Sequence, residues 1–359
     1  MQRQVNAVDF WRGYALIAIF INHIPQNVYE HFTHKNISLS DSAELFVFLA
    51  GWSLRHVVGP PEDPRPTGDL LYRLFGRAIT LYVAQMAIAL LAIAMLAAAA
   101  LLLVNPLFLE WHNAAAIFYD PVRAHIGLVL MSHQLGYFNI LPLYVVLLMI
   151  APSVAIIHRY APSLLLPLSV AIYLVSLVFG LTVPTWPVEG QWFFNPLCWQ
   201  LIFVLGFSMS RERGPGGWAK RNIGWLRLVA APIVVVLGIM SWFNLWWDPT
   251  IVPEPKLLFL IGKTFVTPIR LIQFLALIAV MSAAYPYIVQ VLPNLVRFLS
   301  LLGRNSLPVF CVGSVLSLAG QIVRFAYGGG LLVDTLLVGS GIAVLSLVAW
   351  LSEWRSRKD

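Results

Sequence analysis

Long runs of apolar residues, separated by short polar stretches, dominate the chain from one end to the other. Three of these runs, at 78–104, 228–247 and 271–296, hold no charged residue over about 20 positions or more. A helix of that length crosses a hydrocarbon core about 30 Å thick. The pattern therefore predicts an all-α, polytopic integral membrane protein.

About ten segments are apolar and long enough to predict transmembrane helices, and we treat 1–359 as a single transmembrane domain. The second is marginal, because only 45–54 is uncharged between Glu44 and Arg55, so a short or interfacial helix is an alternative there. The predicted helices span 10–28, 42–59, 78–104, 139–157, 163–183, 195–210, 227–247, 270–292, 305–323 and 333–352.

The placement of basic residues predicts the orientation of these helices. With the N-terminus inside, seventeen of the 23 lysines and arginines fall in cytoplasmic segments and six in outer ones. Cytoplasmic loops of membrane proteins carry such an excess, so both termini are expected in the cytoplasm. The first apolar segment lacks a small-residue cleavage site, so no removable signal peptide is expected.

Composition supports a membrane location. Hydrophobic residues make up 59% of the chain and charged residues 11%, whereas soluble proteins carry about 25% charged residues. The net charge of +7 is spread over several short inner loops, so the lipid bilayer is the predicted partner and no nucleic acid is expected. Both cysteines fall in apolar segments and are interpreted as small hydrophobic residues.

An arginine and a histidine in the first apolar segment are the leading candidates for chemistry. Arg12 and His23 are eleven residues apart, so in a helix they share one face, roughly 16 Å apart. Asp9 precedes Arg12 by three positions and Asn27 follows His23 by four, which extends the polar face. Ionisable groups within a membrane segment are costly, and each is therefore a hypothesis of function.

Two carboxylates at the predicted start of the second helix, Asp41 and Glu44, could assist His23. A carboxylate beside an imidazole orients it and raises its basicity, as a general base requires. The same four-residue spacing also fits a helix N-cap followed by a glutamate, which is a capping box. Both interpretations stay open for these two residues.

Two further polar groups lie at predicted outer helix ends. One consists of His133, Gln134, Tyr137, Asn139 and Tyr144, entering the fourth helix, and the other of Asn195, Trp199 and Gln200, at the start of the sixth. Each group could bind a hydroxylated substrate. Each could equally form interhelical hydrogen bonds or an interfacial aromatic belt.

Inner residues offer a candidate anion site, whereas no metal site is predicted. Arg304 precedes the ninth predicted helix, and both arginine and a helix N-terminus attract phosphate. The alternative is that Asn305 or Ser306 only caps this helix. Arg12 either faces a cavity or is an interfacial arginine whose charge reaches the membrane surface. His31 and His34 have no carboxylate at ligand spacing, so we expect no metal.

Several sequence blocks resemble the OpgC family, which is similar to the membrane-bound type-3 acyltransferases. The signature of those enzymes is an arginine followed eleven positions later by histidine, which Arg12 and His23 match. One departure is Gln26, where glycine is expected after His-Ile-Pro. The matching blocks are Asp9–Gly13, His23–Pro25, Ser40–Gly51, Phe194–Gln200 and Gly303–Phe310.

The resemblance implies succinylation of osmoregulated periplasmic glucans at the inner membrane of Gram-negative bacteria. The donor would be succinyl-CoA, which the sequence does not distinguish from acetyl-CoA, and no permanently bound cofactor is expected. His23 would act as general base with Glu44 or Asp41. Arg12 and Arg304, with Asp9, would hold the donor. The substrate-binding candidates are Asn27, His133, Asn195, Trp199 and Gln200.

Two alternatives remain open at this point. One is O-acetyl transfer to another envelope glycan or an exopolysaccharide. The other is a small-molecule transporter, against which the spans hold few ionisable residues and no repeated halves. The sequence makes no prediction about oligomeric state.

Overall fold

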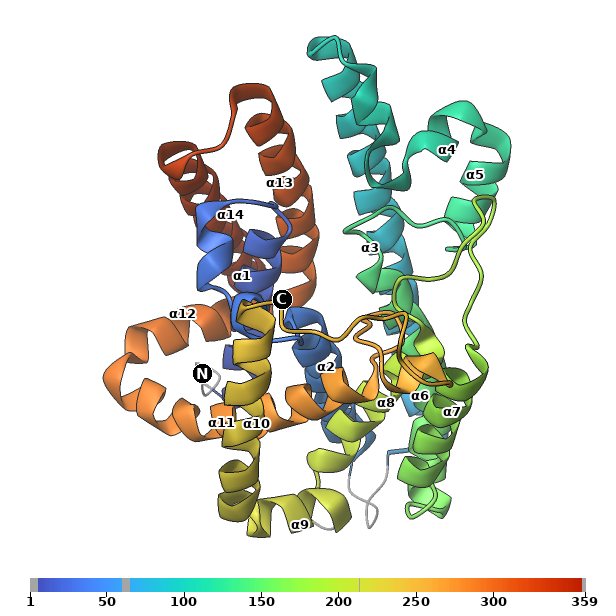
Figure 1. Cartoon of the computed structure of the whole chain (residues 1–359), viewed down its shortest axis with the longest axis vertical. Helices are drawn as coiled ribbons and strands as arrows, with labels where there is room; N and C mark the ends of the chain where they lie inside the picture. Colours follow the sequence, from blue (N-terminus) through green and yellow to red (C-terminus); the bar gives the residue numbers. More distant parts are fainter. Residues whose placement is uncertain (1–5, 60–64, 213, 357–359) are drawn as a thin grey trace.

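The protein is built from helices joined by loops (Figure 1). Our computed structural model describes residues 6–59, 65–212 and 214–356. Within these ranges the predicted all-α class is confirmed, and the one β-type pairing is an isolated bridge between Pro184 and Gln191. Four basic residues assigned to the inner side lie outside the described ranges: Arg3, Arg213, Arg357 and Lys358.

A helix forms in each of the ten predicted segments. They are α1 (Ala7–Asn22), α2 (Ser42–Val58), α3 (Thr67–Leu102), α6 (Ile140–Tyr160), α7 (Leu165–Phe179), α8 (Pro196–Met209), α10 (Ile223–Trp242), α11 (Pro268–Val291), α13 (Ser306–Tyr327) and α14 (Leu331–Ser356). The connections contain further helices that were not predicted. These are α4 (Ala115–Tyr119), α5 (Pro121–Val129), α9 (Gly214–Arg221) and α12 (Pro293–Arg304), with the 3-10 helices η1 (Val28–Phe32), η2 (His34–Ile37), η3 (Pro106–Asn113) and η4 (Lys256–Leu258).

Six of the described helices, α3, α6, α10, α11, α13 and α14, are long and apolar enough to cross a membrane. Two more, α7 and α8, are apolar but shorter. These helices identify a membrane protein, and the total of about ten crossings stays a prediction.

The two largest differences from the predicted helix boundaries have different physical reasons. α1 ends at Asn22 instead of residue 28, because Pro25 has no backbone N–H and cannot continue the helix. α3 begins at Thr67 instead of residue 78. Its first turns contain charged residues such as Arg73, which end an apolar run in the sequence but do not interrupt a helix.

Two glycines bring α1 and α12 into direct backbone contact. A Cβ atom at Gly13 would lie 1.8 Å from the carbonyl oxygen of Leu299, and one at Gly303 would lie 1.8 Å from that of Asp9. Small residues allow such close helix approach inside membranes. The contact joins the N-terminal helix to the C-terminal part of the chain, and it fixes where α1 lies.

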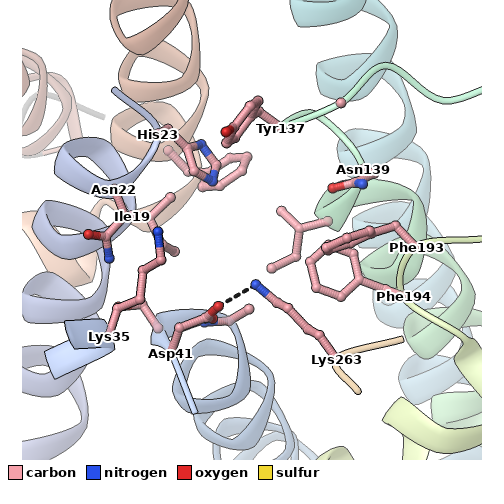
Figure 2. A pocket seen from close by; sticks show the side chains of 15 residues that line it. Ile19, Asn22, His23, Lys35, Asp41, Tyr137, Asn139, Phe193, Phe194 and Lys263 are labelled. Carbon is pink, nitrogen blue, oxygen red and sulfur yellow. Dashed lines mark hydrogen bonds and ion pairs between the residues drawn. The ribbon is translucent and has the colours of Figure 1, made fainter. Parts of the chain in front are cut away.

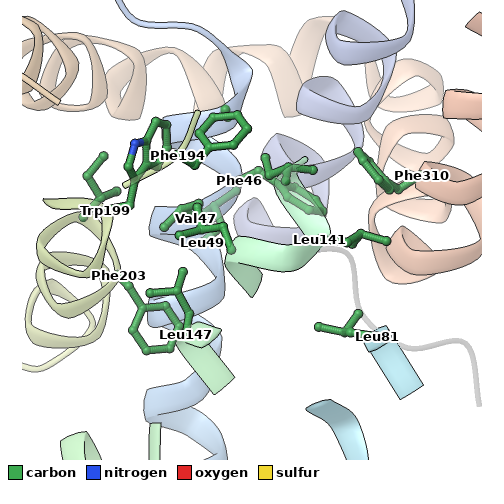
Figure 3. Packing of buried hydrophobic residues seen from close by; sticks show 14 of the residues in the cluster. Phe46, Val47, Leu49, Leu81, Leu141, Leu147, Phe194, Trp199, Phe203 and Phe310 are labelled. Carbon is green, nitrogen blue, oxygen red and sulfur yellow. The ribbon is translucent and has the colours of Figure 1, made fainter. Parts of the chain in front are cut away.

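α2 lies inside the helix bundle rather than at its surface. It packs against α8, α1 and α6, and Figure 3 shows Phe46, Val47 and Leu49 among side chains of neighbouring helices. Gly206 allows this contact, because a Cβ there would lie 2.0 Å from the carbonyl oxygen of Phe48. The helix extends over 17 residues and most of it is buried by neighbouring helices, and whether it crosses the membrane or lies at the interface stays a prediction.

The orientation can be tested with introduced cysteines. Figure 1 shows α9 and the α4–α5 pair at opposite ends of the molecule. After Cys198 and Cys311 are replaced, we expect an impermeant thiol reagent to label a cysteine at 115–129 in intact spheroplasts. A cysteine at 214–221 should react only after lysis, because basic loops stay in the cytoplasm. Labelling of 214–221 in intact spheroplasts would reverse the orientation.

Candidate active site

A cavity of about 320 Å³ lies at the C-terminal end of α1 (Figure 2). Its volume is at the lower end of the range of about 300–1,000 Å³ for small-molecule sites. Segments distant in sequence form its wall, including the ends of α1 and α2, the residues before α6 and α8, and α13. Its polar side chains are those of Asn22, His23, Lys35, Asp41, Ser42, Tyr137, Asn139 and Lys263.

His23 is the C-cap residue of α1, and its ring faces the cavity. Its backbone N–H continues the helix by donating to the carbonyl of Ile19 at 2.9 Å. The imidazole meets the ring of Tyr137 edge-on, with centroids 4.9 Å apart. Within the described part of the chain the imidazole forms no hydrogen bond, and Nδ1 is buried. The ring is therefore available to a ligand in the cavity.

Four charged side chains form a cluster at the base of this cavity, where α2 begins. Asp41 forms an ion pair with Lys263, and Arg270 lies 3.5 Å from Asp41 and also binds Glu44. The Glu44 side chain is fully buried. Burial alone would raise the pKa of the Asp41 carboxyl, but the Lys263 ammonium and the Arg270 guanidinium hold it well below its usual range.

The predicted capping box at the start of α2 is confirmed. Asp41 accepts from the backbone N–H of Ala43 at 2.8 Å, and Glu44 accepts from the backbone N–H of Asp41 at 3.0 Å. Both carboxylates also bind basic groups, so each has two structural roles. Neither forms a hydrogen bond with His23, although Asp41 lines the same cavity.

Lys263 was missed as a candidate and counted only among the outer basic residues. In the structure its ammonium enters the cavity from the loop before α11 (Figure 2). It lies 5.6 Å from the ring centre of Phe193 and 5.4 Å from that of Phe194. The sequence contained signals that could have identified both Lys263 and Arg270. Lys263 lies among apolar neighbours, and Arg270 lies in the first turn of an apolar helix.

Asn27 does not extend the polar face of α1, contrary to the prediction. It lies beyond the end of the helix and is fully buried. Its amide donates to the carbonyls of Ile21, at 2.9 Å, and Ile24. The side chain therefore binds one carbonyl in the last turn of α1 and one in the turn that follows the helix.

Asn195 and Gln200, proposed for substrate binding, belong to the scaffold behind the cavity and do not line it. Asn195 caps α8 through the backbone N–H of Leu197 at 3.1 Å. Gln200 accepts from the hydroxyl of Ser169 at 2.7 Å. Asn195 also donates to the hydroxyl of Ser176 on α7 at 3.2 Å. The contacts of both residues with α7 match the interhelical hydrogen bonds that the sequence left open as the alternative.

Trp199 and His133 are also outside the cavity lining. The indole Nε1 of Trp199 donates to the carbonyl of Lys263 at 3.1 Å, so it supports the loop that carries the cavity lysine. His133 is buried, and its ring nitrogens have no hydrogen-bond partner within the described residues. Asn139, which follows on the same connection, does line the cavity.

The three donor-binding candidates contact protein groups away from the cavity. Arg12 donates to Ser53 at 2.6 Å and to a carbonyl of α2 at 3.2 Å, and lies 3.8 Å from Asp9. Arg304 forms an ion pair with Glu353 at 2.7 Å. Arg12 therefore links α1 to α2, and Arg304 links α12 to α14.

His34 lies beside the cavity, where its Nδ1 is 3.0 Å from the Tyr14 hydroxyl. Across 6–59, 65–212 and 214–356, no three His, Cys, Asp or Glu side chains are grouped so that they could hold a metal ion.

A membrane protein with a histidine-lined cavity at one helix end is the class that the fold and site define. The chain belongs to the OpgC family, because the model of that family, described as OpgC protein, matches residues 3–357. Membership of this family implies a transferase role. Neither a curated protein nor a solved structure matches the chain.

The charge cluster makes a prediction about stability. Arg270→Leu leaves the carboxylate of Glu44 buried without its cation, so we expect a loss of about 3–5 kcal/mol in the free energy of unfolding. Lys256→Ala breaks an exposed pair with Glu254 and should cost no more than about 1 kcal/mol. Denaturant unfolding in detergent measures both, and equal losses would contradict the assigned role of the cluster.

Proposed function

We propose that this protein is an acyltransferase of the bacterial inner membrane. It moves an acyl group, succinyl by family resemblance, from cytoplasmic acyl-CoA to a hydroxyl of a periplasmic glucan. Family membership over nearly the whole chain supports the glucan acceptor and the membrane context. The single observation behind the proposed chemistry is the His23 imidazole, which faces the cavity without a hydrogen-bond partner among the described residues.

In this proposal His23 is the general base. A ring nitrogen of neutral His23 takes the proton of a sugar hydroxyl as the oxygen attacks the thioester carbonyl carbon. The new C–O bond forms, the C–S bond breaks, and the proton passes from the imidazolium to the leaving thiolate. The acyl group ends on the sugar oxygen, CoA leaves as its thiol, and His23 returns to the neutral form.

The other cavity residues suit the two substrates of this reaction. The Lys263 ammonium places positive charge where negative charge develops on the carbonyl oxygen. The amides of Asn22 and Asn139 offer hydrogen bonds to sugar hydroxyls. The rings of Phe193 and Phe194 offer flat apolar faces on which a sugar can pack.

For Asp41 and Glu44, the proposed role is electrostatic rather than direct hydrogen bonding to His23. Together they hold Lys263 and Arg270 beside the cavity. Arg12 and Arg304, with Asp9, remain the proposed contacts for the donor on the inner side. Arg12 would also have a structural role, because its contacts with Ser53 and with a carbonyl of α2 link α1 to α2.

The proposed base is tested by His23→Ala. A single general base contributes about 10²–10⁴-fold, so we expect loss of glucan modification while the protein still inserts into the membrane. His31→Ala is the matched control, because His31 lies in an outer loop outside the cavity lining. Mass spectrometry of periplasmic glucans gives the extent of modification, and the added mass distinguishes succinyl from acetyl. Wild-type modification by His23→Ala would refute the mechanism.

The proposed donor contact is tested by Arg12→Lys. Lysine keeps the charge but loses the planar set of donors that suits phosphate. We expect acyl-CoA affinity to fall by at least roughly 10-fold, because hydrogen bonds to charged groups contribute about 1.5–3 kcal/mol, while glucan affinity is unchanged. Arg123→Lys is the control, because the Arg123 side chain on α5 is exposed. Unchanged acyl-CoA affinity would leave Arg12 with only its structural link to α2.

A further inference from the structure

Three polar side chains on one face of α13 bind the end of α1. Ser317, Gln321 and Arg324 follow one another at helical spacing and donate to three backbone carbonyls. The Ser317 hydroxyl and the Arg324 guanidinium do so at 3.1 Å and 2.8 Å. The accepting carbonyls, in the same order, are those of Phe20, His23 and Gln26. Figure 1 shows the two helices lying alongside each other.

Gln321 differs from the other two because it contacts the proposed base itself. Its Nε2 donates to the backbone carbonyl of His23, at the point where α1 ends. Its Oε1 lies 2.7 Å from Nε2 of His112, which belongs to η3. The buried amide thus joins three segments, α13, η3 and the end of α1.

This geometry also determines the hydrogen-bonding state of His112. The carbonyl of His23 can only accept, so the NH₂ group of Gln321 must point toward it. The amide oxygen of Gln321 then faces His112, whose Nε2 must carry a proton and donate. Burial lowers the pKa of His112, which favours the neutral ring. The contact with Gln321 then sets the proton on Nε2.

His112 also supports the part of the cavity wall that lies beside His23. Its backbone carbonyl accepts from Gly136 at 2.8 Å. Its ring meets Tyr137 edge-on with centroids 5.1 Å apart, and Tyr137 in turn meets His23. One network therefore holds both the backbone of His23 and the aromatic ring that its imidazole contacts.

The imidazole of His23 has no hydrogen bond of its own among the described residues to hold it in place. Catalytic histidines are commonly oriented by a partner on the second ring nitrogen, and here no carboxylate has that role. The direction of the ring therefore depends on the backbone at His23 and on its contact with Tyr137.

We propose that Gln321 is the positioning residue for the proposed base. Its amide, fixed by His112, holds the His23 carbonyl and so sets the direction in which the imidazole enters the cavity. The inference rests on the proposed function of His23, since it assigns no chemistry to Gln321 itself.

The test compares Gln321→Met with Ser317→Ala in the purified full-length protein. Methionine keeps the length of the side chain but loses both amide contacts. Small misplacements of catalytic groups cost up to about 10²-fold, so we expect kcat to fall by roughly 10–100-fold, with KM for acyl-CoA changed less than about 3-fold. Ser317→Ala loses the neighbouring contact on the same face and should stay within about 2-fold of wild type. Equal kcat in the two variants would overturn the proposal.

A double variant separates positioning from general support of the fold. Because Gln321 acts through His23, adding Gln321→Met to His23→Ala should cause no further loss of residual activity, whereas a purely structural role would lower it again. His112→Phe leaves Gln321 in place but removes its fixed partner, and should reproduce part of the kcat loss. It therefore serves as the second variant if Gln321→Met does not fold.

A chemical measurement keeps this inference distinct from the proposed function. Carbethoxylation of His23 by diethyl pyrocarbonate, followed by peptide mass spectrometry, reports the exposure of the ring without requiring turnover. We expect a several-fold change in the His23 rate in Gln321→Met and none in Ser317→Ala. Full activity of His23→Ala would refute the proposed base, whereas an unchanged carbethoxylation rate would refute the positioning role alone.

Discussion

The last turn of α1 and the turn that follows it pack against α13, and their carbonyl groups need hydrogen-bond donors that the helix itself no longer supplies. An unpaired polar group costs several kcal/mol in a hydrocarbon environment, so side chains from elsewhere must supply the donors. Asn27 supplies two from the following loop, and Ser317, Gln321 and Arg324 supply three from α13. This requirement brings α13 against α1 and places His23 at the wall of the cavity.

A second requirement, the pairing of buried charges, shapes the base of the cavity. Asp41 and Glu44 cap α2, and at the same time they are the counter-ions of Lys263 and Arg270. A buried ion needs both a partner of opposite charge and satisfied hydrogen bonds. The start of α2 provides both, and so a loop more than two hundred residues away delivers an ammonium group to the cavity.

The sequence was sufficient to predict the ten main helices and the position of His23 near a helix end, because each depends on local spacing. It offered the capping box as one of two interpretations of Asp41 and Glu44. It was not sufficient to show which residues of distant segments lie around His23. Lys263 and Gln321 lie far along the chain, and no local pattern shows which loop or helix reaches α1. Asn195 and Gln200 were misleading for a related reason, since a polar residue inside a membrane bundle needs a partner whether or not it binds substrate.

Gln26 shows how the turn after His23 is held at a position where we expected glycine. The resemblance leads us to expect glycine there, and Gln26 indeed adopts a φ of 63°, in the left-handed region that favours glycine. Such a conformation costs of order 1–3 kcal/mol. Two contacts oppose that cost: the backbone N–H of Gln26 donates to Glu30 at 3.0 Å, and its carbonyl accepts from Arg324.

Asp334 of α14 anchors the same turn. It pairs with Arg324 and also accepts from the backbone N–H of Val28, so the turn is held on both sides of Gln26. The turn after His23 is therefore fixed by contacts with α13 and α14 rather than by the residue type at its tightest point.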